Sequence, residues 1–122
     1  MRNKILSVVL FIGLFAIFST TKAQQEVVRI DKPFVSKSLS GIITDANGEK
    51  MPFVTIRRFT SDWKNEVEFV ETDNNGKFQF NKLPIGIYYL RISANGFNEL
   101  EVKVILKKNS KIKLKFRLAV ST

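Results

Sequence analysis

Two pairs of acidic residues are spaced two positions apart, Glu66 with Glu68 and Glu71 with Asp73. On a β-strand such side chains share a face and lie about 6.5–7 Å apart, which overlaps the spacing of roughly 6.5–9.5 Å in inverting glycosidases. That chemistry also needs one carboxyl group whose pKa is raised in a buried pocket. A short chain offers little room for such a pocket, so the pairs indicate solvated strand faces.

The run Asp73, Asn74, Asn75 and Gly76 offers the oxygen ligands that Ca²⁺ prefers. In an EF-hand, however, the ligands alternate along the loop and a Glu closes it. Here the polar residues are consecutive and no such Glu follows. We therefore expect a tight turn at this run and no metal site.

Nucleophilic catalysis has little support in the composition. The 122 residues include no His and no Cys, which excludes Ser-His-Asp and Cys-His triads, zinc fingers, Fe–S clusters and disulfides. Ser-x-x-Lys occurs at Ser19, Ser61 and Ser110, but the companion Ser-Asp-Asn and Lys-Thr-Gly motifs are missing. We predict that the chain is not an enzyme and uses no cofactor.

Trp63 is the single tryptophan, and it lies in a polar connection between apolar runs. With Phe59 and Tyr89 it is a candidate platform for stacking on a sugar. The alternative is a loop anchor folded over the end of the domain, because large rings usually bury their area. Both interpretations stay open.

Basic residues recur at every second position near the C-terminal end: Lys111, Lys113, Lys115 and Arg117. On a strand they project from one face. One interpretation is a solvated edge strand, in which Lys prevents edge-to-edge aggregation. The other is weak docking on an anionic envelope surface, such as lipid head groups, an acidic glycan or an acidic partner. We expect a short hairpin through residues 107–109 to place Glu101 opposite Lys115 and Glu99 opposite Arg117.

The first 23 residues have the pattern of a secretory signal peptide. Arg2 and Lys4 precede an apolar run from Ile5 to Phe18, and small residues end at Ala23. A spanning helix needs about 20 apolar residues, so an uncleaved anchor is the weaker alternative. We predict cleavage after Ala23 and a location in the periplasm, at the outer membrane or outside the cell. Nucleic acid is then not an expected partner.

Removal of residues 1–23 takes away Arg2, Lys4 and Lys22, so the basic residues fall from 20 to 17 against 11 acidic residues. The mature chain therefore keeps a net charge of +6. Its length fits one small domain, and the hydrophobic content of 44% is too high for a disordered chain.

Residues 24–37 are polar, contain Pro33 and indicate a linker with room for a short strand at 27–30. From Ser38 onward, short β-rich runs alternate with turn residues, and no helical period holds over ten residues. Seven strands are predicted within a domain at 38–120: 40–44, 53–59, 67–72, 77–80, 87–94, 99–106 and 111–120.

Turn residues separate these runs. Asn-Gly pairs occur at Asn47-Gly48, Asn75-Gly76 and Asn95-Gly96. We expect a positive φ at Gly76 and a similar role for Gly86, which follows Pro84.

Alternation within the later strands predicts the core residues. One face should be buried: Tyr88, Leu90, Ile92, Leu100, Val102, Val104, Leu106, Ile112, Leu114, Phe116 and Leu118. The intervening Glu99, Glu101 and Lys103 should face solvent. One dry and one wet face are typical of an antiparallel sandwich.

The order of these pieces resembles carboxypeptidase regulatory-like domains over residues 38–118. The residues that carry the likeness are 40–45, 47–49, 52–56, 72–78, 83–93 and 95–97. The resemblance implies a seven-stranded, antiparallel Greek-key β-sandwich of the prealbumin-like, Ig-like kind. Such domains occur beside carboxypeptidases, in surface proteins and at the N-terminus of TonB-dependent outer-membrane receptors of Bacteroidetes-type bacteria, and they have no catalytic motif of their own.

The sequence thus predicts a secreted, non-catalytic module that binds a protein or glycan in the cell envelope or outside the cell. The alternative is a carbohydrate-binding, starch-binding-like module that uses the Trp63 loop. A weaker third hypothesis is an enzyme subunit whose catalytic part lies on another chain. No feature of the sequence identifies the ligand or the oligomeric state.

Overall fold

The computed structural model describes residues 26–121, so the predicted signal peptide lies outside the described residues. This part of the chain contains nine strands and no helix. The strands are β1 (Val27–Arg29), β2 (Phe34–Ser36), β3 (Ser40–Thr44), β4 (Thr55–Phe59), β5 (Glu66–Glu71), β6 (Lys77–Gln79), β7 (Gly86–Ser93), β8 (Glu99–Leu106) and β9 (Leu114–Arg117).

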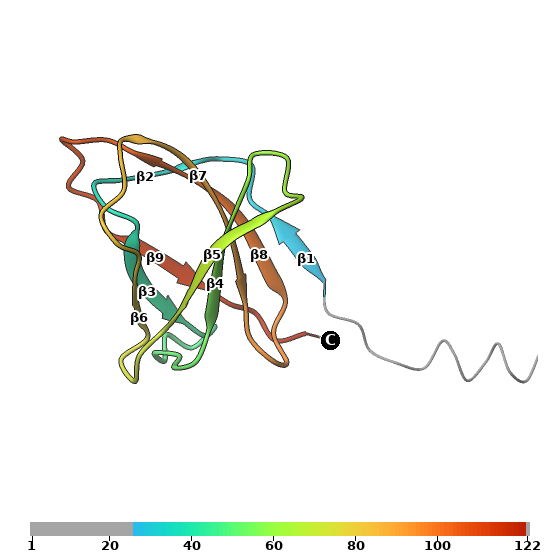
Figure 1. Cartoon of the computed structure of the whole chain (residues 1–122). Coiled ribbons are helices and arrows are strands. Elements are labelled where there is room, and N and C mark those ends of the chain that lie inside the picture. The colour runs from blue at the N-terminus through green and yellow to red at the C-terminus, as the bar shows by residue number, and fades with distance from the viewer. Residues whose placement is uncertain (1–25, 122) are drawn as a thin grey trace, which may run out of the picture.

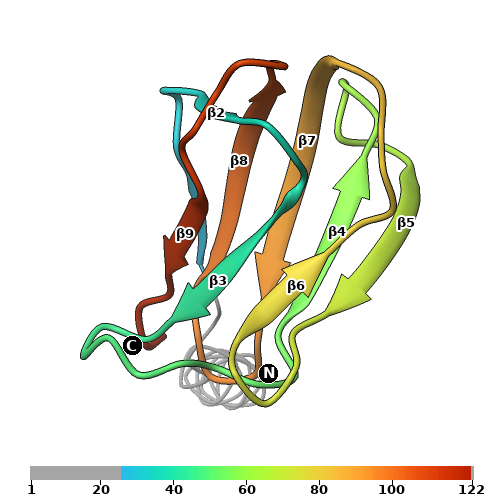
Figure 2. The same cartoon turned by 90° about the vertical axis from the view of Figure 1, so that its left-hand side faces the viewer.

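The strands form two sheets that face each other around the core (Figures 1 and 2). The larger sheet has the order β1-β8-β7-β4-β5, and β2 also pairs with β8. The smaller sheet has the order β6-β3-β9. The all-β, sandwich-like prediction is confirmed, whereas the prediction of purely antiparallel sheets is wrong. Strands β1 and β2 run parallel to β8, and β9 runs parallel to β3.

The segment predicted as a linker carries β1 and β2, which cover the outer edge of β8. Val27 pairs with Glu99 near one end of β8, and Ser36 pairs with Leu106 at the other. Pro33 lies between the two strands, where its missing N–H costs no ladder bond. The ring of Phe34 meets Phe116 edge-on at 4.9 Å between centroids, which ties the segment to the opposite sheet.

The predicted hairpin between β8 and β9 is wrong. The connection after Leu106 crosses to the smaller sheet, where Gly41 pairs with Leu114 and Thr44 pairs with Arg117. A β-carbon on Gly41 would lie 2.3 Å from the Leu114 carbonyl oxygen, so the close approach of β3 and β9 requires glycine at this position. Glu99 and Glu101 consequently do not lie opposite the basic residues of β9.

Two predicted strands are shorter than expected. The strand predicted at 53–59 begins at Thr55, because Phe53 has a φ of 60° and lies in a turn. The strand predicted at 111–120 spans only Leu114–Arg117. The strand at 99–106 has the predicted bounds.

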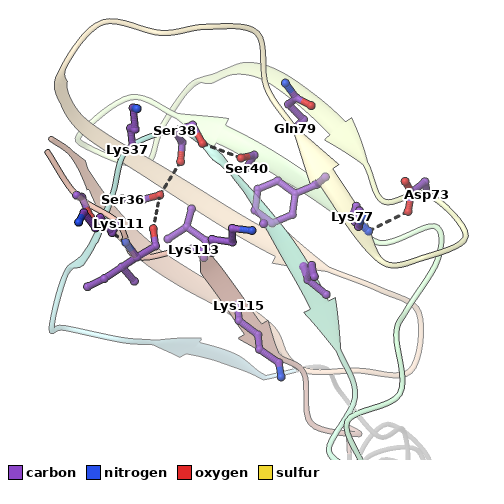
Figure 3. Close-up of a pocket in the computed structure, with 16 residues that line it drawn as sticks. Ser36, Lys37, Ser38, Ser40, Asp73, Lys77, Gln79, Lys111, Lys113 and Lys115 are labelled. Carbon is purple, nitrogen blue, oxygen red and sulfur yellow. Dashed lines mark hydrogen bonds between the residues drawn. The ribbon is translucent and has the colours of Figure 1, made fainter. Parts of the chain in front are cut away.

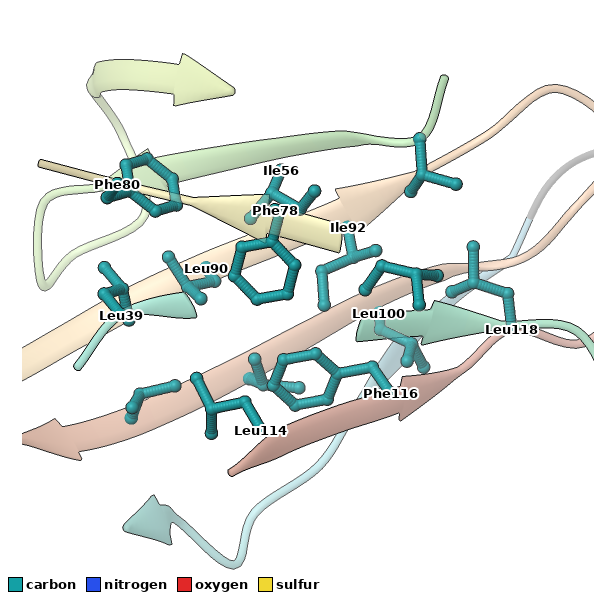
Figure 4. Packing of buried hydrophobic residues seen from close by; sticks show 14 of the residues in the cluster. Leu39, Ile56, Phe78, Phe80, Leu90, Ile92, Leu100, Leu114, Phe116 and Leu118 are labelled. Carbon is teal, nitrogen blue, oxygen red and sulfur yellow. The ribbon is translucent and has the colours of Figure 1, made fainter. Parts of the chain in front are cut away.

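The buried cluster contains most of the predicted core residues and lies between the sheets (Figure 4). From β8 all four predicted side chains are buried, and Leu114, Phe116 and Leu118 are buried from the C-terminal strand and its end. Three predictions fail: Ile112 is exposed, Tyr88 is only half-buried, and Glu101 is buried. Phe78 stacks on Phe116 with centroids 6.3 Å apart, which joins β6 to β9 across the smaller sheet.

The Asn-Gly turns are confirmed. Gly76 has a φ of 72°, and Gly48 and Gly96 each have a φ of 83°. Gly86 is a correction: it lies within β7 and does not have a positive φ. The turn before β7 is formed by the residues ahead of Gly86, so this glycine takes the extended conformation of the strand.

Candidate functional site

The predicted calcium-like run forms a turn that is held by its own aspartate. The Asp73 carboxylate accepts hydrogen bonds from the backbone N–H groups of Asn75 at 2.8 Å and Lys77 at 2.9 Å. The Lys77 N–H, followed by the Asn75 N–H, lowers the pKa of Asp73 below its ordinary value. Asp45 accepts the two corresponding hydrogen bonds in its own loop, from the backbone N–H groups of Asn47 and Glu49. Within residues 26–121, no three carboxylates lie close enough to hold a metal ion.

Glu66 and Glu68 do not share a strand face. A register shift between Arg58 and Phe59 makes β5 irregular at this point. Glu66 forms an ion pair with Arg57 at 2.9 Å, and Glu68 with Arg58 at 3.3 Å. Because consecutive strand residues point to opposite faces, the two carboxylates are separated by the sheet and form no acid pair.

The three predicted platform rings do come together. Trp63 meets Tyr89 edge-on at 5.6 Å and Phe59 in a tilted arrangement at 6.0 Å between centroids. All three side chains are half-buried. They lie on the outer face of the larger sheet, where β4 and β7 pair Phe59 with Tyr89.

Cationic groups approach the faces of these rings. The Arg91 guanidinium carbon lies 4.5 Å from the Phe59 centroid and 5.8 Å from that of Trp63. Arg29 lies 5.4 Å from the Trp63 centroid. Contacts of this kind are favourable cation–π interactions. The rings therefore form an anchor for the 60–65 loop, and two arginines contact their faces.

The Trp63 backbone is held in an uncommon conformation, with a φ of 63°. The Trp63 N–H donates to the Thr60 carbonyl at 2.9 Å, and the Asp62 carboxylate accepts from the Lys64 N–H at 3.0 Å. The Thr60 hydroxyl, followed by the Lys64 N–H, lowers the pKa of Asp62. These bonds offset the cost of a positive φ at a bulky residue.

Glu101 lies beneath the aromatic cluster and carries a paired charge. Its carboxylate accepts hydrogen bonds from Arg91 at 2.7 Å and Arg29 at 3.0 Å, and the residue is only 4% exposed. Burial raises the pKa of Glu101, but the bonds from Arg91 and Arg29 outweigh it and hold the pKa below the ordinary value. The prediction that Glu101 faces solvent is wrong because β1 brings Arg29 over it.

A second surface, the lysine groove, lies over the outer face of the smaller sheet (Figure 3). Its volume is about 770 Å³. Five lysines line it: Lys37, Lys77, Lys111, Lys113 and Lys115. Asp73 is the one acidic residue in the lining within the described chain, and its carboxylate is engaged by the turn amides.

The sheet register explains how the lysines converge. Ile42 of β3 pairs with Lys77 of β6 on one side and with Lys115 of β9 on the other. Neighbouring strands lie about 4.8 Å apart, so the two lysines stand about 10 Å apart across one row. Four serines add hydroxyl groups to the lining: Ser36, Ser38, Ser40 and Ser110.

The two-sheet, all-β sandwich agrees with the fold class that the sequence likeness implied, although both sheets are mixed. Residues 38–119 match the sequence profile of the carboxypeptidase regulatory-like domain. The chain belongs to this family. No curated protein matches the chain.

The regulatory-like domain itself provides most of both surfaces. Trp63, Tyr89 and four of the five groove lysines fall inside the matched residues, whereas Arg29 and Lys37 precede them. Strands β1 and β2 also precede the match, so the segment that covers β8 lies outside the family's core. Among the described residues, no helix is long and apolar enough to span a membrane.

Of the predicted basic residues, Lys111, Lys113 and Lys115 line the groove of the regulatory-like domain, and Arg117 does not. Sequence reasoning missed Lys37 and Lys77. Their proximity to the other groove lysines depends on the parallel pairing of β3 with β9 and on the docking of residues 34–36. Neither can be predicted from a local sequence pattern. β9 is also an edge strand of its sheet, in agreement with the protective role expected of Lys115.

Proposed function

We propose that the chain is a non-catalytic binding module that works outside the cytoplasm and holds an acidic envelope partner, protein or glycan, in the lysine groove. One observation carries the proposal: five lysines surround one groove whose single carboxylate is already engaged. The family membership supports a module without chemistry of its own.

The positive charges of the lysines attract an anion, and binding also relieves the repulsion between neighbouring lysines. Lys113 and Lys115 are two positions apart on or beside β9, and such neighbours are separated by about 6.8 Å, inside the Debye length of roughly 8 Å at physiological salt. An anionic ligand offsets this repulsion, and the Ser110 hydroxyl, which accepts a hydrogen bond from the Ile112 N–H, can donate one to it. Binding through exposed lysines should be weak and strongly dependent on salt.

A soluble acidic polymer, poly-glutamate, tests the groove. We expect binding at low ionic strength that falls steeply towards about 150 mM salt, and the double variant Lys113→Glu/Lys115→Glu should abolish it. The matched control is Lys50→Glu/Lys64→Glu, which makes the same charge change at exposed lysines outside the groove. Equal loss in both double variants would show that net charge, and not the groove, governs binding.

Export is part of the same proposal, and the pattern of residues 1–23 supports it. The exported protein should begin at Gln24. Intact-mass analysis of the exported protein measures this directly. A mature form that retains Met1–Ala23 would contradict cleavage.

A carbohydrate-binding function at the Trp63 loop is the second candidate. A groove of about 330 Å³ lies beside Trp63 and Tyr89 and is also lined by Asp31 and Ser61, which could bind sugar hydroxyls. Binding to a neutral glycan on an array, lost in Trp63→Ala and retained in Lys113→Glu/Lys115→Glu, would favour this candidate. Absence of neutral-glycan binding would remove it.

A further inference from the structure

One end of the sandwich is formed by the last row of the larger sheet. Gly86 begins β7 and pairs with Leu106, which ends β8, and Leu106 pairs with Ser36, which ends β2. Ile85 immediately precedes this row. The connections that leave it lie at the end opposite the arrowhead of β7 in Figure 2.

Large apolar side chains are exposed at this end. Ile85 is 68% exposed and Ile112 is 65% exposed. The connection that carries Ile112 contacts this row, because the Ser36 hydroxyl donates a hydrogen bond of 3.2 Å to the Ile112 carbonyl. Gly86 and Ser36 stand two strand spacings, about 10 Å, apart in the row, so the two isoleucines lie at this end of the molecule in separate connections.

The connections beside Ile112 are rich in lysine. Exposed lysines follow the ends of β2 and β8 and continue into the connection before β9: Lys37, Lys107, Lys108 and Lys111. The Lys107 N–H donates to the Ser36 carbonyl at 2.8 Å, which fixes the start of the connection at the same row. Residues 32–44, 74–98 and 102–122 contain no Asp or Glu. The β4–β5 connection reaches the same end, because Phe59 at the end of β4 pairs with Tyr89 near the start of β7, and it carries Asp62.

We propose that this apolar–basic tip (Ile85, Ile112, Lys37, Lys107, Lys108 and Lys111) docks on an anionic lipid bilayer. Ile85 and Ile112 enter the head-group region, and the lysines contact lipid phosphates. This inference rests on the proposed function, the binding of an anionic envelope component. It identifies the anionic component that contacts this end of the molecule as a lipid surface.

A lipid surface explains why exposed isoleucines and lysines occur together at this end, whereas an acidic polymer in solution explains only the lysines. Stable attachment to a bilayer takes two contributions, buried apolar area and a basic patch, and both occur here at one end of the molecule. Ile85 lies outside the lining of the lysine groove, so a polymer held in the groove gains nothing from it.

Co-sedimentation with vesicles tests the tip. Vesicles of phosphatidylcholine with about one-third phosphatidylglycerol provide the anionic surface, and pure phosphatidylcholine provides the neutral one. We expect binding to the anionic vesicles alone. Ile85→Ser/Ile112→Ser should weaken binding at least about tenfold, and Lys107→Ser/Lys108→Ser by about thirtyfold.

Matched controls lie at the other end of the sandwich. Phe53 is 74% exposed and Val120 is 63% exposed, and Phe53 precedes β4, whose first residue pairs with the last residue of β7. Phe53→Ser/Val120→Ser removes comparable exposed apolar area and should bind as the wild type does. The unfolding midpoint of each variant shows whether it folds. We expect all of these variants to fold, because the four substituted side chains are exposed.

The outcomes separate this inference from the proposed function. Unchanged vesicle binding in Ile85→Ser/Ile112→Ser would overturn docking by the tip and leave anion binding intact. Binding to poly-glutamate without any binding to anionic vesicles would do the same. Failure to bind either probe would overturn both proposals.

Discussion

Gly76 lies directly against the backbone of Ile43. The Ile43 N–H donates a hydrogen bond of 2.8 Å to the Gly76 carbonyl, and a β-carbon on Gly76 would lie 2.6 Å from the Ile43 carbonyl oxygen. The turn between β5 and β6 is therefore clamped onto β3. Glycine is needed here both for its positive φ and for the space.

These two requirements can be separated by substitution. Gly48 also has a positive φ, but nothing lies within 4 Å of the position of its β-carbon. Gly48→Ala should cost about 1–2 kcal/mol from backbone strain alone, and Gly76→Ala should cost clearly more because the clash adds to it. Urea unfolding measures both. Lys77→Ala, at an exposed neighbour, should stay within about 0.5 kcal/mol of wild type. Equal losses at the two glycines would contradict the clamp.

The charge of Glu101 should make stability depend on pH. Its pKa is lowered from the ordinary value of 4.5 in the folded protein, so the stabilisation is present above that value. It is lost as pH falls through the lower, folded pKa. Glu101→Gln should cost about 2–3 kcal/mol at neutral pH and should flatten the decline in unfolding free energy below about pH 5.

The control for this prediction is Glu68→Gln, which removes a more exposed carboxylate paired with Arg58. Exposed pairs contribute about 1 kcal/mol or less, so the cost at neutral pH should be small. A pH profile of Glu101→Gln that follows the wild type would show that the Arg29–Glu101–Arg91 contacts do not stabilise the fold.

Strain at Trp63 should reverse the usual order of two substitutions. Trp63 has a φ of 63°, which costs alanine about 1 kcal/mol and glycine almost nothing. Both Trp63→Ala and Trp63→Gly lose the ring contacts with Phe59 and Tyr89. Trp63→Gly should therefore be the more stable of the two by about 1 kcal/mol in urea unfolding. A less stable glycine variant would indicate that the loop relaxes and stores no strain.

Deletion of residues 24–37 should expose the outer edge of β8, which β1 and β2 now cover. A long unpaired edge strand is a site for association with other chains. The shortened protein should self-associate in light scattering and unfold at a lower temperature, since it also loses the Phe34 contact with Phe116. Deletion of residues 24 and 25 alone, which keeps the hydrogen bond from the Glu99 N–H to the Glu26 carbonyl, is the control. A monomeric deletion variant with an unchanged midpoint would contradict the covering role.

Local sequence patterns predicted the strand bounds and the tight turns, because these features depend on residues close together in the sequence. Clean alternation of apolar and charged residues set the bounds of β8, and Asn75-Gly76 identified a turn because few residues tolerate a positive φ. The partner of β9 was not predictable in this way. Alternation shows that the side chains of Leu114 and Phe116 are on the buried face of their strand. They would be buried equally if β9 paired with β8 in the larger sheet or lay opposite β8 in the smaller one.

The candidate sites were predictable only in part for the same reason. Phe59, Trp63 and Tyr89 were identified by type and do meet. The arginines over them were missed, because Arg29 arrives on a strand far away in sequence. Glu101 follows the alternation of a solvent-facing residue, and only contacts of the folded chain bury it.

The parallel pairing of β3 with β9 sets the order of events when the chain folds. Gly41 stands near the start of the family match and Leu114 near its end, so the smaller sheet cannot close until the last strand is available. Such distant pairings lose chain entropy before any contact repays it, and they fold slowly. A nascent chain that lacks β9 lacks Leu114 and Phe116, two of the buried core side chains. Under the proposed export, the polypeptide would leave the cytoplasm before it could acquire its native structure.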